Sequence, residues 1–482
     1  MPFTDLRFLL LFLPAAVGGY QILPQKIRLW FVVANGLAFL WLSQPYYMIF
    51  FVFFIVLNYL LGRWLYANIE NIQISRVILW ISLLVNLGLL IAFKLLAQYP
   101  PLISNFIAID VVNTKASTLS WIFPLGFSYI IFQVIAYFLD IKNEITPAEP
   151  NILKFSSLLL FFPKMIAGPI QRYRDSISEL NFMATSPTKV AEGLRRFIQG
   201  LAKKVILADT IAKFIDPVFS QTIPNVTTLQ AWMVLIGYSI QLYYDFSGYT
   251  DMAIGLGEAF GLKMVENFNW PYISKNVTEF WRRWHISLSS WFRDYVFIPI
   301  QYHLRKQKRY PIQLTILLVF LLTGLWHGFH WHFVAWGLML GAIIGLEATK
   351  FGKLLQKAWI PLQHLWMLFW ILMSWVLFRS PGISFAINFY KSLFGLQGEL
   401  TLLPFSQTIP FPVIENSVKI AFILGAILAV PLIPWIKSQF GLDKVEPSWF
   451  TVVRDLCLVV LLIYCLGLIT SNGPMPGIYG AF

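Results

Sequence analysis

Charged side chains are scarce in this sequence. Only 12% of its 482 residues are Asp, Glu, Lys or Arg, and 58% are hydrophobic. A soluble domain usually has about 25% charged and roughly 45–50% apolar residues, so this composition excludes one. Apolar stretches long enough to cross a bilayer, about 20 residues, recur along the whole chain. A soluble domain with a single membrane anchor is therefore excluded as well.

Cysteine is almost absent, with Cys457 and Cys465 as the two examples. In one apolar helix they would lie about 12 Å apart along the axis, which is too far for a disulfide bond. We expect both to serve as small apolar side chains. Long polar stretches are also lacking and no internal repeat is evident, so we expect one membrane domain over residues 1–482, with core motifs at about 120–350 and C-terminal helices at 359–470.

The apolar stretches predict an all-α polytopic membrane protein with about 11–13 transmembrane or re-entrant helices. Arg7 and the apolar run after it resemble a signal peptide, but no clear cleavage site follows, so we predict an uncleaved first helix. The candidate spans are residues 7–22, 28–43, 45–61, 76–97, 119–139, 153–169, 228–262, 311–326, 331–349, 359–379, 418–436 and 451–470.

The formal net charge of +13 does not indicate nucleic-acid binding, because the basic residues form short clusters between apolar runs. Such clusters remain on the cytoplasmic side of membrane proteins. Residues 283–305 contain only a short apolar stretch, interrupted by Arg293 and Asp294, so we expect this segment to be interfacial or re-entrant. The clusters that we place in the cytoplasm are Arg195, Arg196, Lys203 and Lys204; Arg282 and Arg283; Arg305, Lys306, Lys308 and Arg309; and Lys350, Lys353 and Lys357.

His327 lies between two apolar runs whose outer ends, at Arg309 and Lys350, are basic. This pattern predicts a helical hairpin with His327 at its apex. Arms of about 16 residues would place the apex about 24 Å from the basic rim. An ionisable residue at such depth is costly and is therefore a candidate functional residue. In the mostly apolar surround of Trp326 and its neighbours we expect a neutral imidazole, which can accept a hydroxyl proton.

Such a base could activate an alcohol to attack an acyl thioester, a reaction that needs no metal. The alternative is a histidine that only forms hydrogen bonds between helices. His330 and His332, together with His327, could also form a metal cluster. No carboxylate lies near them in the sequence to complete such a shell, so we predict no metal site.

The segment 279–285 combines aromatic and basic residues at the cytoplasmic boundary. Arg282 and Arg283 could bind phosphate groups of a nucleotide-like acyl donor, and Trp281 or Trp284 could offer a stacking face. His285 would then lie at the entrance for the acyl donor. The alternative is an interfacial belt of tryptophan and arginine.

Two further polar segments interrupt apolar regions. Residues 241–251 contain Asp245 and Asp251, which either contribute to a site or pair with arginines and fix helix packing. In residues 161–170, Gly and Pro break a helix where protein or a cavity must satisfy the freed backbone groups. That segment marks either the edge of a site or a bend.

Several separate segments together resemble the membrane-bound O-acyltransferase superfamily, in particular its bacterial branch of alginate O-acetylase-like proteins. The resemblance implies helices around a central funnel or tunnel, with His327 as the catalytic histidine and His285 as its companion. We assign Asp245, Asn269 and Trp326 to binding of the acyl donor, together with Trp281, Arg282, Arg283 and Trp284. The matching segments are residues 124–128, 161–170, 200–204, 243–255, 267–272, 280–287 and 324–328.

The resemblance implies an acyltransferase of the bacterial inner membrane that binds no cofactor and uses acetyl-CoA or an acylated carrier as its acyl donor. The acceptor would be hydroxyl groups of an exported, alginate-like polysaccharide, reached directly or through an extracytoplasmic acetyltransferase- or esterase-like partner protein. D-alanyl transfer and acylation of peptidoglycan or lipid are alternatives within this class. A transporter or flippase and a non-catalytic scaffold are alternatives outside it. Lys164, His330 and His332 are not part of the family's pattern.

Overall fold

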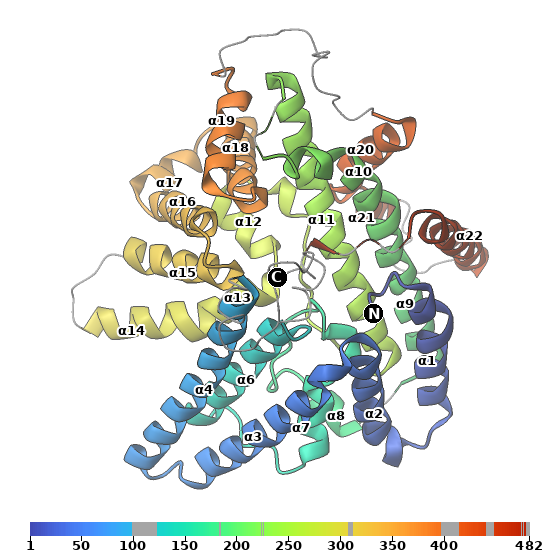
Figure 1. Ribbon diagram of the computed structural model, residues 1–482, viewed down its shortest axis with the longest axis vertical. Coiled ribbons are helices and arrows are strands. Elements are labelled where there is room, and N and C mark those ends of the chain that lie inside the picture. The colour runs from blue at the N-terminus through green and yellow to red at the C-terminus, as the bar shows by residue number, and fades with distance from the viewer. Residues whose placement is uncertain are drawn as a thin grey trace, which may run out of the picture. The chain divides into compact units, whose positions relative to one another are not determined.

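The computed structural model describes residues 1–98, 123–182, 185–222, 224, 226–306, 312–396, 414–439, 448–473, 475, 477 and 478. Within these ranges the regular secondary structure is helical, apart from one isolated bridge between Phe268 and Trp284. The predicted all-α class is therefore confirmed (Figure 1). Lys308 and Arg309 of the predicted basic rim, and residues 119–122 of one predicted span, lie outside the described residues.

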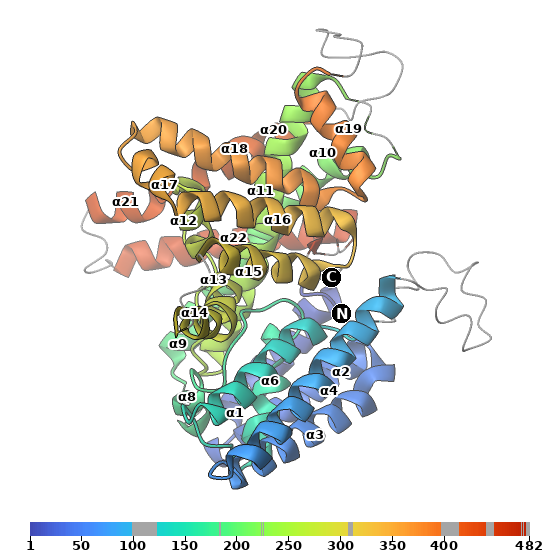
Figure 2. The same ribbon diagram turned by 90° about the vertical axis from the view of Figure 1, so that its left-hand side faces the viewer.

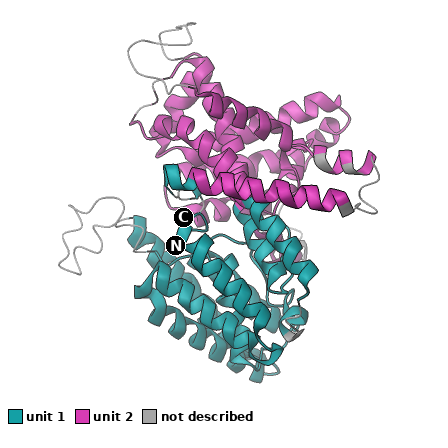
Figure 3. Cartoon of the chain, turned by 90° about the vertical axis from the view of Figure 1, so that its right-hand side faces the viewer, with its two compact units in different colours: residues 1–200, 249–266, 469–481 teal, residues 201–248, 267–468, 482 magenta. Residues whose placement is uncertain are grey.

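The chain divides into two compact units, each assembled from more than one stretch of sequence (Figure 3). Unit 1 comprises Met1–Gly200, Tyr249–Glu266 and Ile469–Ala481, and unit 2 comprises Leu201–Gly248, Asn267–Leu468 and Phe482. The long helix α11 (Thr228–Ala259) contributes to both. Every residue that the sequence assigns to the candidate site belongs to unit 2.

Unit 1 contains α3, α4 and α6 side by side (Figure 2). A π-helical turn at Phe8–Phe12 and 3-10 turns at Pro45–Tyr47 and Phe162–Lys164 accompany its helices. The helices are α1 (Leu13–Ile22), α2 (Gln25–Ser43), α3 (Met48–Ala67), α4 (Ile72–Gln98), α6 (Phe127–Lys142), α7 (Ile152–Leu159), α8 (Ile177–Phe182) and most of α9 (Pro187–Ala202).

The helices α3 and α4 expose apolar side chains and bury polar ones among their apolar contacts. Ile49, Trp80 and Leu84 are exposed, whereas Asn58 and Asn86 are fully buried. Asn86 Nδ2 donates a hydrogen bond to Asn58 Oδ1 at 2.7 Å and so links the two helices. In lipid, polar groups need such internal partners while outward side chains are apolar. This distribution is that of helices embedded in a bilayer.

Five helical segments of the described chain are long and apolar enough to cross a membrane, namely Gln25–Ser43, Pro45–Ala67, Ile72–Gln98, Ile360–Arg379 and Trp449–Asn472. Shorter apolar helices are Phe8–Ile22, Ile312–His327, Trp331–Glu347 and Asn416–Leu428. The predicted continuous spans at residues 153–169 and 418–436 are both wrong. In the first, α7 ends at Leu159 and a 3-10 turn follows, because Pro163 cannot continue the α-helical hydrogen bonding. The second is interrupted between α20 (Asn416–Leu428) and α21 (Leu432–Gln439).

Unit 2 contains α15, α16 and α18 side by side (Figure 2). Residues 286–306 are helical without interruption, through α13, a π-helical turn and α14, but this run is not among the described helices that are apolar enough to cross a membrane. The interfacial or re-entrant position of residues 283–305 stays a prediction. The helices are α10 (Asp209–Phe219), α12 (Val277–Arg283), α13 (Ile286–Phe292), α14 (Ile298–Lys306), α15 (Ile312–His327), α16 (Trp331–Glu347), α17 (Lys350–Leu355), α18 (Ile360–Arg379), α19 (Ile383–Leu393), α20 (Asn416–Leu428), α21 (Leu432–Gln439) and most of α22 (Ser448–Asn472), with π-helical turns at Lys203–Ala208 and Arg293–Phe297 and a 3-10 turn at Pro271–Ile273.

Candidate active site

The predicted hairpin is present in unit 2, and His327 is the last residue of its first arm. Residues 328–330 form the turn between α15 and α16. The arms pack at backbone contact: a Cβ atom on Gly324 would lie 2.4 Å from the carbonyl oxygen of Phe333, and one on Gly337 would lie 2.4 Å from that of Phe320. Small residues at such contacts let membrane helices approach closely. The glycines therefore fix His327 relative to α16.

Four aromatic rings, which we call the aromatic box, surround the imidazole of His327. The ring centroids of Trp326 and Phe378 lie 4.7 and 4.8 Å from that of His327, and those of Trp336 and Phe333 lie at 5.3 and 6.0 Å. Phe333 is nearly parallel to the imidazole, whereas the other rings are steeply inclined to it. His327 is 5% exposed. The box thus keeps the imidazole away from bulk water, and Trp326 forms part of this apolar surround, as predicted.

His285 lies at the joint between α12 and α13. Its backbone is left-handed, with φ 44° and ψ 54°, a conformation that residues other than glycine adopt only where the surroundings hold them. The ring is buried, and Phe246 packs edge-on against it with centroids 4.7 Å apart. Burial lowers the pKa of His285 to about 3, so the imidazole is neutral near pH 7.

Hydrogen bonds join His285 to the segment 267–272. His285 Nδ1 lies 3.2 Å from Asn267 Oδ1, and this oxygen also accepts hydrogen bonds from the backbone N–H and the hydroxyl of Ser287, at 3.0 and 2.9 Å. The backbone N–H of Asn269 donates to the carbonyl of Arg283 at 2.9 Å, next to the bridge between Phe268 and Trp284. Two segments that are separate in the sequence therefore form one antiparallel pair beside His285.

Glu347, at the end of α16, holds the N-terminus of α12. Its carboxylate accepts hydrogen bonds from the backbone N–H groups of Val277 and Thr278, each at 2.8 Å. The Thr278 hydroxyl donates at 2.6 Å and the Trp366 indole at 3.0 Å. These bonds satisfy N–H groups that a helix start otherwise leaves without partners. Sequence reasoning missed Glu347, although an acidic residue in the last turn of an apolar helix opposes the helix dipole and so indicates an external partner.

Trp281 in α12 and Trp284, which directly follows this helix, are buried in an aromatic cluster. Trp284 stacks on Phe280 at 5.4 Å and packs against Trp375 at 5.2 Å, and Trp281 lies 5.7 Å from Trp336 of the aromatic box. Ring contacts therefore run from the aromatic box to the residue that precedes His285. Both faces of Trp284 are thus occupied by protein, which leaves little room for stacking on an acyl donor.

Arg282 is the exposed residue of this segment, whereas Arg283 is engaged by its neighbours. The Arg283 guanidinium pairs with Glu279 at 3.0 Å and donates to the carbonyl of Asn269 at 3.2 Å. The side chain of Asn269 is itself exposed. The structure thus brings Asn269 and Arg283 together and leaves Arg282 accessible to an anionic ligand.

Asp245 belongs to a buried ion-pair cluster. Lys204 Nζ lies 2.6 Å from Asp245 Oδ1 and 2.5 Å from Asp209 Oδ1. Burial alone would lower the pKa of Lys204, but the two carboxylates outweigh it and raise that pKa. Burial raises the pKa of Asp209 to about 7, although Lys204 opposes the shift. The partner of Asp245 is thus a lysine and not the arginine that the packing alternative predicted.

Asp251, by contrast, does pair with an arginine, in unit 1. Arg196 approaches Asp251 Oδ1 at 2.8 Å and binds both carboxylate oxygens of Glu266, at 2.7 and 2.6 Å. The two carboxylates of the segment 241–251 therefore each have a cationic partner. Both pairings favour a packing role for these carboxylates.

In unit 1, the segments 124–128 and 161–170 lie in direct backbone contact. Gly126 has φ 65°, and a Cβ atom there would lie 1.3 Å from the carbonyl oxygen of Met165, so only glycine fits. Lys164 is buried, and its Nζ donates a hydrogen bond to Gln133 Oε1. The segment 161–170 thus forms a bend held by protein contacts.

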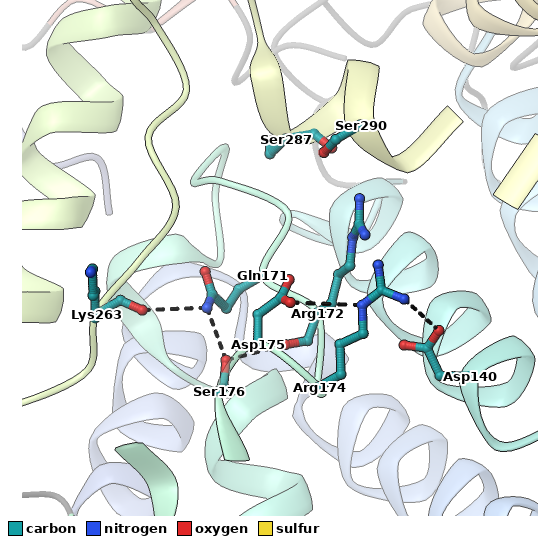
Figure 4. Close-up of polar contacts among 9 residues, drawn as sticks. All are labelled: Asp140, Gln171, Arg172, Arg174, Asp175, Ser176, Lys263, Ser287 and Ser290. Atoms are coloured by element: carbon teal, nitrogen blue, oxygen red, sulfur yellow. Dashed lines mark hydrogen bonds and ion pairs between the residues drawn. The ribbon is translucent and has the colours of Figure 1, made fainter. Parts of the chain in front are cut away.

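Polar side chains fix the chain just after this bend (Figure 4). Gln171 Nε2 donates to the Ser176 hydroxyl at 3.0 Å and to the carbonyl of Lys263 at 3.4 Å. The Arg174 guanidinium pairs with the buried carboxylate of Asp140 at 3.3 Å. Sequence reasoning did not single out Gln171 and Arg174, because Lys263 and Asp140 lie far from them in the chain.

The two histidines that follow His327 differ in burial. His332 is buried, and its Nδ1 donates a hydrogen bond to the carbonyl of Leu377 at 3.0 Å. His330 is exposed and stacks on the ring of His332 with centroids 5.6 Å apart. Among the residues that the structure describes, no group of three or more His, Cys, Asp or Glu side chains is arranged to hold a metal ion.

Comparisons with known proteins show the family of this chain. The family model of the membrane-bound O-acyltransferase family matches residues 102–395, a range that includes His285 and His327. A protein named probable alginate O-acetylase from Azotobacter vinelandii is 35% identical over 411 residues, which cover 83% of this chain and 79% of that protein.

Two other relatives carry different names. A peptidoglycan O-acetyltransferase from Helicobacter pylori is 32% identical over 437 residues, covering 82% of this chain and 80% of the relative. A teichoic acid D-alanyltransferase from Bacillus subtilis is 33% identical over 250 residues, covering 49% and 62%. Because the family model matches more than half of the chain and the alginate-type relative matches most of it, this multi-pass membrane protein is an acyltransferase that belongs to the membrane-bound O-acyltransferase family.

Proposed function

We propose that the protein transfers an acetyl group from a cytoplasmic acyl donor to hydroxyl groups of an exported, alginate-like polysaccharide at the bacterial inner membrane, with His327 as general base. The observation that carries this proposal is the position of His327, buried in the aromatic box at the turn of the hairpin. A buried base shielded from bulk water is suited to remove a proton from an alcohol.

The reaction needs one proton acceptor and one leaving group. As the acceptor hydroxyl oxygen attacks the thioester carbonyl carbon and a C–O bond forms, the imidazole of His327 takes the hydroxyl proton. The tetrahedral intermediate then expels the thiolate, which breaks the C–S bond. The imidazolium returns the proton to the sulfur, so that an ester and a free thiol are the products.

The acyl donor that we propose is acetyl-CoA or an acylated carrier. Arg282 supports acetyl-CoA in particular, because it is exposed and can bind a phosphate group of that donor. Trp281 and Trp284, on either side of Arg282 in the chain, are buried and so anchor the segment that carries Arg282. No tightly bound cofactor takes part in the proposed reaction.

Acetyl transfer is favoured over D-alanyl transfer by how much of the chain each relative covers. The alginate-type relative and the peptidoglycan O-acetyltransferase match more than four-fifths of the chain, whereas the D-alanyltransferase matches about half. The alginate-type relative has the highest identity of the three, so an alginate-like polysaccharide is the proposed acceptor. Transfer occurs directly or through an extracytoplasmic acetyltransferase-like partner protein.

The test uses the full-length protein in proteoliposomes with acetyl-labelled CoA on one side. Oligosaccharides of alginate, peptidoglycan and teichoic acid are supplied separately on the other side, and mass spectrometry measures the acetyl groups gained by each. We expect acetylated alginate-type oligosaccharide. Acetylation of peptidoglycan fragments alone would overturn the proposed acceptor.

The same vesicles distinguish an enzyme from a transporter. If labelled substrate crossed the membrane unmodified and no acetylated product formed with any acceptor, with or without a periplasmic extract, the proposal of an acetyl transfer reaction would be wrong. Acetylation that requires the periplasmic extract would support transfer through a partner protein.

A further inference from the structure

Asn267 directs its side-chain oxygen at His285. The residue is fully buried, and its Oδ1 lies 3.2 Å from His285 Nδ1 while accepting two hydrogen bonds from Ser287. One of the Ser287 groups is a backbone N–H, which can only donate a hydrogen bond. The atom that faces it must therefore be the oxygen of the amide, and the orientation of the Asn267 side chain follows from this contact.

This orientation fixes the tautomer of His285. Because Asn267 Oδ1 can only accept, His285 Nδ1 must carry the proton for the contact to be a hydrogen bond. In a neutral imidazole the other nitrogen, Nε2, then carries the lone pair. The left-handed backbone at His285 supports the same arrangement, because it holds the ring against Asn267 at the start of α13.

The nitrogen of the Asn267 amide is a second, independent observation. Among the described residues, no hydrogen-bond acceptor reaches the buried Nδ2 of Asn267. An amide with a purely structural role usually satisfies both of its ends, and a buried polar atom left without an acceptor calls for a functional reason. Three hydrogen bonds on the oxygen with none on the nitrogen indicate a side chain arranged to orient its neighbour.

We propose that Asn267 is a positioning residue that holds His285 in the Nδ1–H tautomer, so that His285 Nε2 presents its lone pair to the hydroxyl or thiol group of the acyl transfer reaction. The assignment of a role to His285 rests on the proposed function. The tautomer itself does not, since it follows from the contacts of Asn267.

Nitrogen NMR of the protein labelled with 15N-histidine tests the tautomer without any substrate. The chain has six histidines, and the signals of His285 are identified as those missing from His285→Gln. We expect wild type to show a protonated Nδ1 and an unprotonated Nε2. In Asn267→Ala we expect both tautomers, because the oxygen that selects one is gone. A single Nδ1–H tautomer in Asn267→Ala would overturn the proposal.

Asn267→Asp keeps the shape and the acceptor oxygen, and so covers the case in which the alanine variant does not fold. A carboxylate beside Nδ1–H favours the charged imidazolium, so the pKa of His285, which burial holds at about 3 in wild type, should rise. Protonation of both ring nitrogens should then occur at higher pH than in wild type. An unchanged titration of His285 in Asn267→Asp would contradict the proposed contact.

Kinetics complete the test with a matched control. Asn267→Ala should lower kcat roughly 10–100-fold, the range for losing a residue that orients a functional side chain, while KM for the acyl donor changes less. The control is Ser290→Ala, which removes a hydroxyl from α13, the helix that follows His285. The Ser290 hydroxyl donates its hydrogen bond to the carbonyl of Ser287. If the tautomer responds as expected but wild type transfers no acetyl group, the proposed function fails and the positioning role of Asn267 stands.

Discussion

At the scale of single residues, the two histidines differ in what surrounds them. His327 is enclosed by the rings of the aromatic box, and His285 is oriented through Asn267. An imidazole enclosed by apolar rings is suited to take and return a proton, whereas one fixed in a single tautomer is suited to orient a group. Neighbouring rings connect the surroundings of the two residues within unit 2.

The ion-pair cluster around Lys204 gives a prediction for stability. Lys204→Met removes the cation between Asp209 and Asp245 and leaves two carboxylates buried together. Breaking a buried ion pair in this way costs about 3–5 kcal/mol. We therefore expect a large fall in the thermal unfolding temperature in detergent. Lys213→Met, a change at an exposed lysine of α10, is the control, and equal unfolding temperatures for the two variants would contradict the role of Lys204.

At the scale of helices, the position of α12 depends on Glu347. Glu347→Gln replaces one acceptor oxygen by an N–H₂ group, which then faces a backbone N–H or the Thr278 hydroxyl. We expect a loss of about 0.5–2 kcal/mol in stability, as for a lost helix cap, and faster amide hydrogen exchange in α12. Mass spectrometry of exchange in residues 275–285 measures this effect.

The control for this change is Glu415→Gln, which alters an exposed glutamate at the start of α20. Exchange in residues 275–285 should be the same in that variant as in wild type. If Glu347→Gln also left exchange unchanged, Glu347 would not be the residue that holds α12 in place.

The hairpin of α15 and α16 depends on its glycines. In Gly337→Ala, the new Cβ atom would lie 2.4 Å from the backbone oxygen of Phe320, which cannot move like a flexible side chain. The helices must separate, at a cost of about 1–3 kcal/mol, and His327 must shift relative to the aromatic box. We expect lower thermal stability together with slower acetyl transfer. Gly88→Ala, where no atom lies within 4 Å of the new Cβ, should match wild type.

A hairpin that tolerated Gly337→Ala without loss of stability or transfer would show that the contact with Phe320 is not required.

The hairpin was predictable from the sequence, because two apolar runs between basic ends indicate an antiparallel pair. The contact of Glu347 with α12 was not predictable, because 70 residues separate Glu347 from Val277 and no local pattern joins them.

At the scale of the whole molecule, composition was sufficient to predict an all-α membrane protein. At residues 153–169 hydropathy alone indicated one span, whereas the Gly and Pro residues of the segment 161–170 correctly indicated a break. The candidate residues of unit 2 could be named from motifs, but their contacts could not. Asn267 and Lys204 lay within matching segments, yet their roles depend on His285 and Asp245, which other helices supply. The single domain over residues 1–482 stays a prediction.

Membrane orientation gives a prediction for the complete chain. The basic cluster around Lys353 should face the cytoplasm. Lys353 is exposed, so a cysteine placed there, in a background with Cys457 and Cys465 replaced by alanine, should react with a membrane-impermeant maleimide in inside-out vesicles. The same variant in right-side-out vesicles is the control and should not react. Labelling only in right-side-out vesicles would reverse the proposed orientation.

The role of His327 as general base is the central claim, and the rate of acetyl transfer by His327→Gln in proteoliposomes tests it most directly. Loss of a general base should slow transfer about 10²–10⁴-fold, without a matching fall in expression or in unfolding temperature. His330→Gln, a change at the exposed histidine of the same turn, should transfer acetyl groups at nearly the wild-type rate. Transfer by His327→Gln as fast as by wild type would contradict the account.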